Sequence, residues 1–321
     1  MEERKSRRPK DNALKQQRLW AYQPIHTLKS TVIVLSVSGT LFFIFGIVLY
    51  VEADQVKEYS ERYDNHIGCN GTWDKPATCE IEIDIDDRME NPVYIYYQLY
   101  NFYQNYRLYV KSRSYVQLRG DSMTSTEHAK CSPIKKVKDL DLKRDVSWKN
   151  TPLSESQDAN PCGLVAKSVF NDTYALYYSE NTTRINISEK DIAWKSDRDY
   201  MFKRTSDYED SEWIDVEDEH FIVWMRNAPM PTFRKLWGII KQDLESGVYR
   251  LQIKDNYDVS RWSGEKHIVF STANSLGGKN YFLGLVFLSA GGMCVVAIIF
   301  FCGMSMFSKK KVIDPAHLKW K

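Results

Sequence analysis

Two long apolar runs lie near the ends of this 321-residue chain. Residues 31–51 (TVIVLSVSGTLFFIFGIVLYV) carry no charge between Lys29 and Glu52, and residues 281–307 are equally free of charge up to the run that starts at Lys309. A helix needs about 20 apolar residues to cross the hydrocarbon core of a bilayer. A core helix of a soluble protein would carry polar residues along one side. The pattern therefore predicts two transmembrane helices.

Between these runs, residues 52–280 read mainly as short strands. Glu80–Ile85 alternates strictly between acidic and apolar residues, as a strand with one buried face does, and Val93–Tyr97 is β-branched and aromatic throughout. Similar short runs bounded by turn residues are Arg184–Ile187, Phe221–Met225, Val248–Ile253 and His267–Ser271.

One segment has the period of a helix instead. Apolar residues recur there at i, i+3, i+4, i+7 and i+11, in Phe233, Leu236, Trp237, Ile240 and Leu244. Pro231-Thr232 precedes the segment and Gly247 follows it, as at helix ends. The expected fold is a mainly antiparallel, sandwich-like β domain with short helices, joined to two transmembrane helices.

Charge predicts the orientation in the membrane. Residues 1–30 hold eight basic and three acidic residues, residues 308–321 hold five and one, and residues 52–280 hold 31 and 38. Short basic flanks stay in the cytoplasm. We therefore expect cytoplasmic tails at 1–30 and 308–321, spans at 31–51 and 281–307, and a luminal or extracellular domain at 52–280. The basic tails favour contact with anionic membrane lipids over nucleic acid.

The first run does not resemble a cleaved signal peptide. It is longer than an ordinary signal h-region, it begins only after 30 residues, and no small-x-small cleavage site follows it. We interpret it as an uncleaved signal anchor.

Four cysteines fall in the middle segment: Cys69, Cys79, Cys131 and Cys162. In an oxidising compartment they predict two disulfides, for which three connectivities exist. We favour the local pairing of Cys69 with Cys79 and of Cys131 with Cys162, although loop lengths do not decide between the three. No CxxC spacing supports a zinc site.

Four glycosylation sequons lie in the same segment and none in the tails. They begin at Asn70, Asn171, Asn181 and Asn186. Their positions agree with the luminal or extracellular side that charge predicts.

No motif for catalysis or metal binding is present. The chain lacks GxSxG, HExxH, a Gly-rich phosphate loop and GxGxxG, and its histidines are scattered singly. The acidic run 207–219 lacks the ligand-and-glycine pattern of a calcium loop. We expect no catalytic residue, no cofactor and no metal, and infer a scaffold or subunit.

Several segments, in order, resemble one family. They are Gln16–Leu19 with Gln23–Ile25, Asn101–Asn105 with Tyr109–Arg113, Pro161–Gly163, Phe170–Thr173, Ile192–Trp194 with Ser196-Asp197, Phe221–Arg226, Pro231–Leu236, and Leu276–Asn280 with Phe282–Gly284. Together they resemble the cell division control protein 50 (ligand-effect modulator) family, over residues 14 to about 300. Its members are the non-catalytic β-subunits of type IV P-type ATPases, the phospholipid flippases.

The resemblance implies a heterodimer with a catalytic ATPase that moves aminophospholipids from the outer or luminal leaflet to the cytoplasmic leaflet. The β-subunit would support folding, export from the endoplasmic reticulum and activity of that ATPase, at locations from the endoplasmic reticulum to the Golgi, endosome or plasma membrane. This chain has no DKTG phosphorylation motif, as expected of the non-catalytic partner.

The resemblance also implies roles for particular residues. Cys131 and Cys162 match a family disulfide, and Asn171 matches a glycosylation site. Candidate partner contacts are Gln17, Arg18, Trp20, Gln23 and Pro24 in the N-terminal tail, and Phe233, Arg234 and Lys235 in the domain. For the last three, the alternative is a helix that packs on its own domain. The tail departs from the family, which often has Pro-Ala-Trp where this chain has Trp20-Ala21-Tyr22. Many members also have extra paired cysteines near Cys69 and Cys79.

Two other classes share parts of this pattern. A two-span ligand-gated channel subunit has the same topology, but such channels carry more external cysteines and polar pore-lining residues. An adhesion or lectin-like receptor is the second alternative, in which the external domain alone would carry the function.

Overall fold

The computed structural model describes residues 11–20, 27–71, 75–141, 146–179 and 183–307. The chain forms two compact units. One comprises the residues up to 51 and those from 281 onward, and the other comprises residues 52–280.

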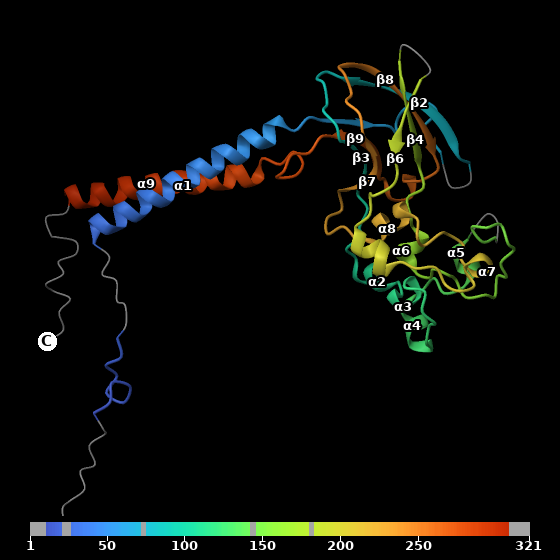
Figure 1. Ribbon diagram of the computed structural model, residues 1–321, viewed down its shortest axis with the longest axis horizontal. Helices are drawn as coiled ribbons and strands as arrows, with labels where there is room; N and C mark the ends of the chain where they lie inside the picture. Colours follow the sequence, from blue (N-terminus) through green and yellow to red (C-terminus); the bar gives the residue numbers. More distant parts are fainter. Residues whose placement is uncertain (1–10, 21–26, 72–74, 142–145, 180–182, 308–321) are drawn as a thin grey trace, which may run out of the picture. The chain divides into compact units, whose positions relative to one another are not determined.

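The first unit is a pair of long helices, α1 (Leu28–Gln55) and α9 (Phe282–Phe307), both long and apolar enough to cross a membrane (Figure 1). Glycines allow the two helices to approach closely. A Cβ on Gly46 would lie 2.8 Å from Leu288 Cγ, and one on Gly39 would lie 3.1 Å from Cys294 Cβ. These small residues permit tight packing of the two helices. Such packing matters in a lipid bilayer, where the hydrophobic effect does not drive helices together.

The second unit is built on two antiparallel sheets. The first has the order β1 (Glu58–Arg62), β9 (Glu265–Ser271), β3 (Val93–Tyr100), β7 (Phe233–Ile240) and β6 (Ile187–Ser188). The second has the order β2 (Ala77–Ile85), β8 (Gly247–Asp255), β4 (Thr173–Tyr178) and β5 (Arg184–Ile185). Inward side chains of both sheets belong to one hydrophobic core, as in a β-sandwich.

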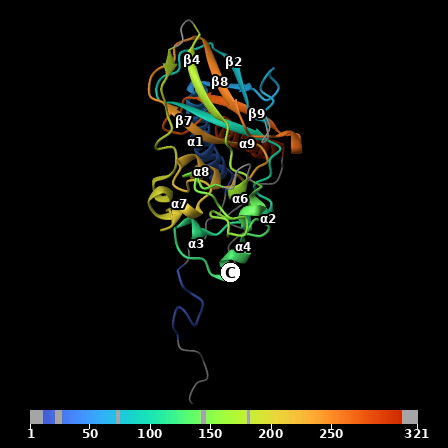
Figure 2. The same ribbon diagram turned by 90° about the vertical axis from the view of Figure 1, so that its right-hand side faces the viewer.

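Short helices gather at one end of this unit (Figures 1 and 2). Between β3 and β4 the chain forms α2 (Arg107–Lys111), α3 (Tyr115–Leu118), α4 (Ser125–Lys130), α5 (Val137–Leu140) and α6 (Leu164–Lys167). Between β6 and β7 it forms the π-helix η1 (Asp197–Met201), α7 (Tyr208–Ser211) and α8 (Glu219–Met225), and between β8 and β9 the 3₁₀-helix η2 (Ser260–Trp262). Residues of α3, α6 and α8 extend the sandwich core into this helical end.

The predicted fold class is confirmed, and four predicted strands lie within β2, β3, β8 and β9. The predicted strand Arg184–Ile187 is divided: β5 pairs with β4 in one sheet, whereas β6 pairs with β7 in the other. This four-residue segment pairs with both sheets because each of its two strands, β5 and β6, contributes only two residues.

The helix predicted over Phe233–Leu244 is wrong, because Phe233–Ile240 is strand β7. The register against β3 shifts where Ile95 faces Gly238 and Tyr96 faces Leu236, so Trp237 is an extra residue in a bulge. The bulge breaks the two-residue alternation and brings Phe233, Trp237 and Ile240 all into the interior. Their spacing of four and three residues imitates a helical period.

The strand predicted over Phe221–Met225 is also wrong, because these residues belong to helix α8. Four of them are buried, and a fully apolar run has the same pattern in a buried helix as in a buried strand. Local polar contacts decide the outcome. Asp218 accepts a hydrogen bond from the His220 N–H at 3.0 Å and caps the N-terminus of α8.

Candidate functional site

The domain buries two lysines, and their surroundings differ. Of the residues that the structure describes, no group of three or more His, Cys, Asp or Glu side chains is placed to hold a metal ion. The distinctive chemistry of the described residues lies instead around Lys266 of β9 and Lys235 of β7, both almost fully buried.

Lys266 is enclosed by two carboxylates. Its Nζ donates to Asp172 at 2.8 Å, to Asp255, and to the Tyr257 carbonyl at 2.7 Å. Asp172 also accepts from the Tyr63 hydroxyl at 2.7 Å. Buried charges of opposite sign with every polar atom paired are compatible with a stable interior. This cluster joins the ends of β1, β4 and β8 to β9.

Burial shifts the titration of these groups. It raises the pKa of the Asp172 carboxyl, while Lys266 and the Tyr63 hydroxyl oppose that rise. Burial also raises the pKa of Tyr63 and of Tyr174 well above the ordinary range, and the adjacent Asp172 charge adds to both shifts. Tyr63 and Tyr174 are therefore neutral hydrogen-bonding groups at physiological pH.

Lys235 is surrounded by backbone carbonyls instead. Its Nζ donates to the carbonyls of Val223 at 3.0 Å and Trp224 at 3.1 Å, and also to that of Arg226. These acceptors lie at the C-terminal end of α8, where a cation stabilises the unsatisfied carbonyls and the negative end of the helix dipole. Burial, with the like charge of Arg113, lowers the pKa of Lys235 to about 7.

Arg113 reaches the same helix end from the segment between α2 and α3. Its Nη1 donates to the Met225 carbonyl at 2.6 Å and to Asn227 Oδ1 at 3.0 Å, and burial lowers the pKa of its guanidinium. Within the described ranges neither Arg113 nor Lys235 has an ion-pair partner. Two basic side chains therefore hold this helix end, and no carboxylate of the described residues lies between them.

Arg226 directly follows α8 and, unlike buried Lys235, is exposed at the surface. Its guanidinium binds buried Asp197 through two bonds of 2.7 and 2.6 Å and lies 4.3 Å from the centre of the Trp194 ring. A hollow of about 570 Å³ opens on one side, lined by Arg113, Tyr115 and Tyr200 among others. A second hollow has a volume of about 520 Å³. Arg226 and Asp197 line both hollows.

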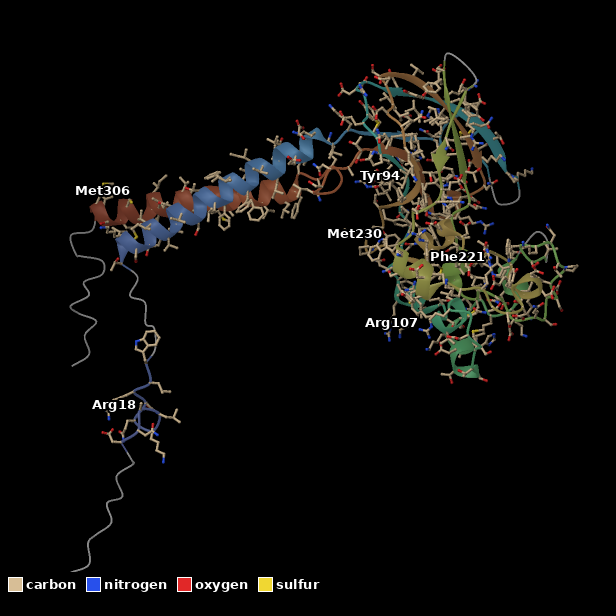
Figure 3. All side chains as sticks on the ribbon, in the orientation of Figure 1. Arg18, Tyr94, Arg107, Phe221, Met230 and Met306 are labelled. Carbon is tan, nitrogen blue, oxygen red and sulfur yellow. A yellow bond between two sulfur atoms is a disulfide. The ribbon has the colours of Figure 1, made fainter. Side chains whose placement is uncertain are left out.

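Large side chains around these hollows face outward. Trp194 is 67 % exposed and Tyr200 is 73 % exposed. Figure 3 shows Phe221 of α8 inside the domain and Met230 at its surface. Exposed aromatic residues beside arginines are the composition of binding hot spots on protein surfaces. We refer below to Trp194, Tyr200, Arg113 and Arg226 as the arginine–aromatic surface.

The structure joins Cys69 to Cys79 and Cys131 to Cys162, with Cα–Cα distances of 5.2 and 5.6 Å. The first disulfide ties the loop after β1 to β2. The second lies in a small separate core with Ile134, Leu140 and Ala159 and holds the helical end together.

Three of the four sequon asparagines fall in the described ranges. Asn70 and Asn186 are exposed, whereas Asn171 is half-buried and its carbonyl accepts a hydrogen bond from Asn256. Asn181 lies outside the described residues.

The candidate partner contacts fall into three groups. Gln17, Arg18 and Trp20 are exposed in the N-terminal tail, and Gln23 and Pro24 lie outside the described residues. Phe233 and Lys235 are buried within the domain. Arg234 is half-buried and pairs with Glu58 at 2.8 Å. Of the three strand residues, Arg234 is thus the one that a partner reaches most directly.

A family model described as the LEM3 (ligand-effect modulator 3) family / CDC50 family matches residues 49–311. The chain belongs to this family. It is 36% identical to ALA-interacting subunit 3 of Arabidopsis thaliana, over 98% of this chain and 91% of that protein. It is 34% identical to cell cycle control protein 50A of Bos taurus (90% and 86%) and 29% identical to cell cycle control protein 50B of Homo sapiens (91% and 92%). The predicted family is confirmed, and this CDC50-family chain is a two-span membrane protein.

Lys235 was predicted from the sequence as a candidate partner contact, but neither the burial of Lys235 and Lys266 nor the groups that surround them were predicted. A signal for the cluster around Lys235 was present, because segments that carry the family resemblance, Tyr109–Arg113, Ile192–Asp197 and Phe221–Arg226, meet around Arg226 in the fold. For the cluster around Lys266, the family segment Phe170–Thr173 contains Asp172, but none of the segments that carry the resemblance contains Lys266 or Asp255, and Lys266 lies 94 positions from Asp172 and 11 from Asp255.

Proposed function

We propose that this chain is the non-catalytic accessory (β) subunit of a type IV P-type ATPase that translocates phospholipids. Its role is to support folding, export from the endoplasmic reticulum and activity of a catalytic subunit that moves aminophospholipids from the outer or luminal leaflet to the cytoplasmic leaflet. Membership of the CDC50 family carries this proposal, because its relatives include proteins named ALA-interacting subunits that match nearly the full length of the chain.

The organisation of the chain supports an accessory role. The arginine–aromatic surface is built for contact, and the helix pair α1 and α9 leaves large apolar side chains exposed along its length. Protein surfaces of both kinds fit a subunit that binds a membrane-embedded partner.

We propose the following arrangement in the membrane. Residues 1–30 and 308–321 are cytoplasmic tails, residues 31–51 and 281–307 cross the bilayer, and residues 52–280 are luminal or extracellular and glycosylated at Asn70, Asn171, Asn181 and Asn186. The complex resides between the endoplasmic reticulum and the Golgi, endosome or plasma membrane. The basic tails and the exposed Asn70 and Asn186 support this orientation.

Co-purification tests the function. The tagged full-length chain is solubilised from its native membrane in mild detergent, and the proteins bound to it are identified and quantified by mass spectrometry. We expect one large polypeptide carrying a DKTG motif in near-equal amount. An unrelated tagged two-span protein from the same membrane serves as the control. Recovery of a homo-oligomer without any ATPase would refute the accessory-subunit proposal.

Glycosidase sensitivity tests the orientation. Removal of a single sequon by Asn70→Gln or Asn186→Gln should increase gel mobility by one glycan step, and peptide N-glycosidase should then remove the difference. Unchanged mobility of both variants, together with no mobility shift of the wild type on peptide N-glycosidase treatment, would contradict the proposed glycosylation and remove its support for this orientation.

A further inference from the structure

The two hollows beside Arg226 are positively charged, although the domain that contains them is acidic. Residues 52–280 hold 31 basic and 38 acidic residues. The residues that line the hollows include four basic side chains, Arg113, Arg226, Arg234 and Lys235, and a single acidic one, Asp197. Among the residues that line these hollows, basic side chains therefore outnumber acidic ones, unlike in the domain as a whole.

Local partners compensate two of the four cations and leave two. Arg226 pairs with Asp197, and Arg234 pairs with Glu58 at 2.8 Å. Among the described residues, Arg113 and Lys235 donate hydrogen bonds to carbonyl and amide oxygens and have no carboxylate partner. Aromatic rings lie beside them instead, with the ring centre of Tyr115 4.7 Å from Arg113 and those of Trp224 and Phe233 each 5.5 Å from Lys235. The Nε of Arg113, which lines the larger hollow, is buried and has no hydrogen-bond partner among the described residues. A desolvated guanidinium with an unused donor is stabilised by a carboxylate.

The walls of the hollows suit a peptide segment. Tyr115 and Tyr200 line the larger hollow, and Trp194 lines the other. They offer broad apolar surface together with hydroxyl and indole N–H donors, and the Tyr115 ring centre lies 4.7 Å from the Arg113 guanidinium. The combination of aromatic anchors and arginines matches the recognition of an acidic protein segment.

We propose that the arginine–aromatic surface seats an acidic loop of the partner protein, with an Asp or Glu side chain of that loop directed at Arg113 and Arg226. This inference rests on the proposed accessory function and specifies the chemistry of the partner at this surface. The carboxylate completes the compensation that the domain itself leaves unfinished, and Trp194 and Tyr200 pack against the neighbouring apolar side chains of the loop.

Charge variants at Tyr200 test the proposal. The Tyr200 side chain is 73 % exposed, so a substitution at this position is compatible with folding. Tyr200→Glu places a negative charge at the larger hollow and should reduce the co-purified partner at least about tenfold, since like charges repel across an interface. Tyr200→Lys should retain the partner. Ile67, fully exposed after β1 and lining neither hollow, provides the matched controls Ile67→Glu and Ile67→Lys, which should both bind like the wild type.

A second pair of variants tests the arginine. Arg226→Gln should weaken binding, and the wild-type complex should lose partner as salt is raised because ionic contacts are screened. Arg88→Gln is the matched control, since the Arg88 and Arg226 side chains are 56% and 55% exposed and each pairs with an aspartate. The thermal unfolding temperature of each purified variant separates lost binding from lost folding.

A photo-crosslinking residue in place of Tyr200 identifies the occupant. We expect it to capture a partner peptide that contains Asp or Glu. Capture of a lipid or of a second copy of this chain, or equal binding by Tyr200→Glu and Tyr200→Lys, would overturn the inference while the wild-type chain still retains its ATPase. Loss of the ATPase from the wild-type chain would instead refute the proposed function.

Discussion

Lys266 and Lys235 occupy similar depths in one domain but are stabilised in different ways. Lys266 is held by Asp172 and Asp255, whereas Lys235 is held by carbonyls at the end of α8. The first arrangement pairs the buried ammonium with carboxylates, whereas the second offers carbonyl dipoles, and burial there lowers the pKa of the lysine to about 7. We interpret the first cluster as structural and propose that a partner completes the electrostatics around the second.

Loss of Lys266 should have the largest effect. Lys266→Met leaves two buried carboxylates without their cation, and breaking such a cluster costs about 3–5 kcal/mol in the free energy of unfolding. We expect a much lower thermal unfolding temperature for the purified full-length protein, or retention in the endoplasmic reticulum. An unfolding temperature equal to that of the wild type would show that the charges of this cluster do not stabilise the domain.

Loss of the Cys131–Cys162 disulfide should be the next largest. Cys131→Ser together with Cys162→Ser should lower the free energy of unfolding by about 2–5 kcal/mol, because the unfolded chain gains freedom. Chemical denaturation of the double variant measures the change. If the variant unfolds at the wild-type denaturant concentration, the small core around this disulfide holds the helical end without it.

Lys235→Met should be less harmful than Lys266→Met. The substitution removes hydrogen bonds to the end of α8 but leaves no buried carboxylate without its cation. We therefore expect the free energy of unfolding to fall by about 1–2 kcal/mol. Thermal unfolding of the two variants, side by side, measures the difference. Equal destabilisation would remove the distinction between the two lysines.

The pH dependence sharpens the same comparison. Burial lowers the pKa of Lys235 to about 7 in the folded protein. In the unfolded chain the pKa of this lysine is near its higher, ordinary value. At a pH between the folded and unfolded pKa values, the unfolded state therefore binds more protons than the folded state. Raising the pH from 7 to 9 should therefore increase the stability of the wild type relative to Lys235→Met. Unfolding temperatures measured across this range check it; a constant difference would place the folded pKa of Lys235 outside the range.

The smallest effect is expected at Arg234. Its pair with Glu58 is partly exposed, and such pairs contribute below about 1 kcal/mol. Arg234→Ala should shift the unfolding temperature only slightly, which calibrates the larger shifts at Lys235 and Lys266. A shift as large as that of Lys235→Met would show that β7 depends on this surface pair.

Some elements followed directly from local pattern. The two uncharged runs, and the alternation in Glu80–Ile85, depend only on residues next to each other in sequence, and they became α1, α9 and β2. The secondary structure of Phe221–Met225 and Phe233–Ile240 was not predictable in this way, because their apolar pattern fits a helix as well as a strand. The bulge at Trp237 and the capping of α8 by Asp218, Arg113 and Lys235 settled them.

The candidate site divides in the same way. Residue patterns along the chain were enough to predict the two apolar spans, the β-rich domain between them, its four cysteines and the family to which the chain belongs, because each depends on composition or on motifs that are continuous in sequence. Only the tertiary structure decided the pairing of Lys266 with Asp172 and the meeting of Arg113, Trp194 and Arg226 around two hollows. These groups come from distant segments, and whether a buried charge is compensated depends on neighbours that folding alone brings within hydrogen-bond distance.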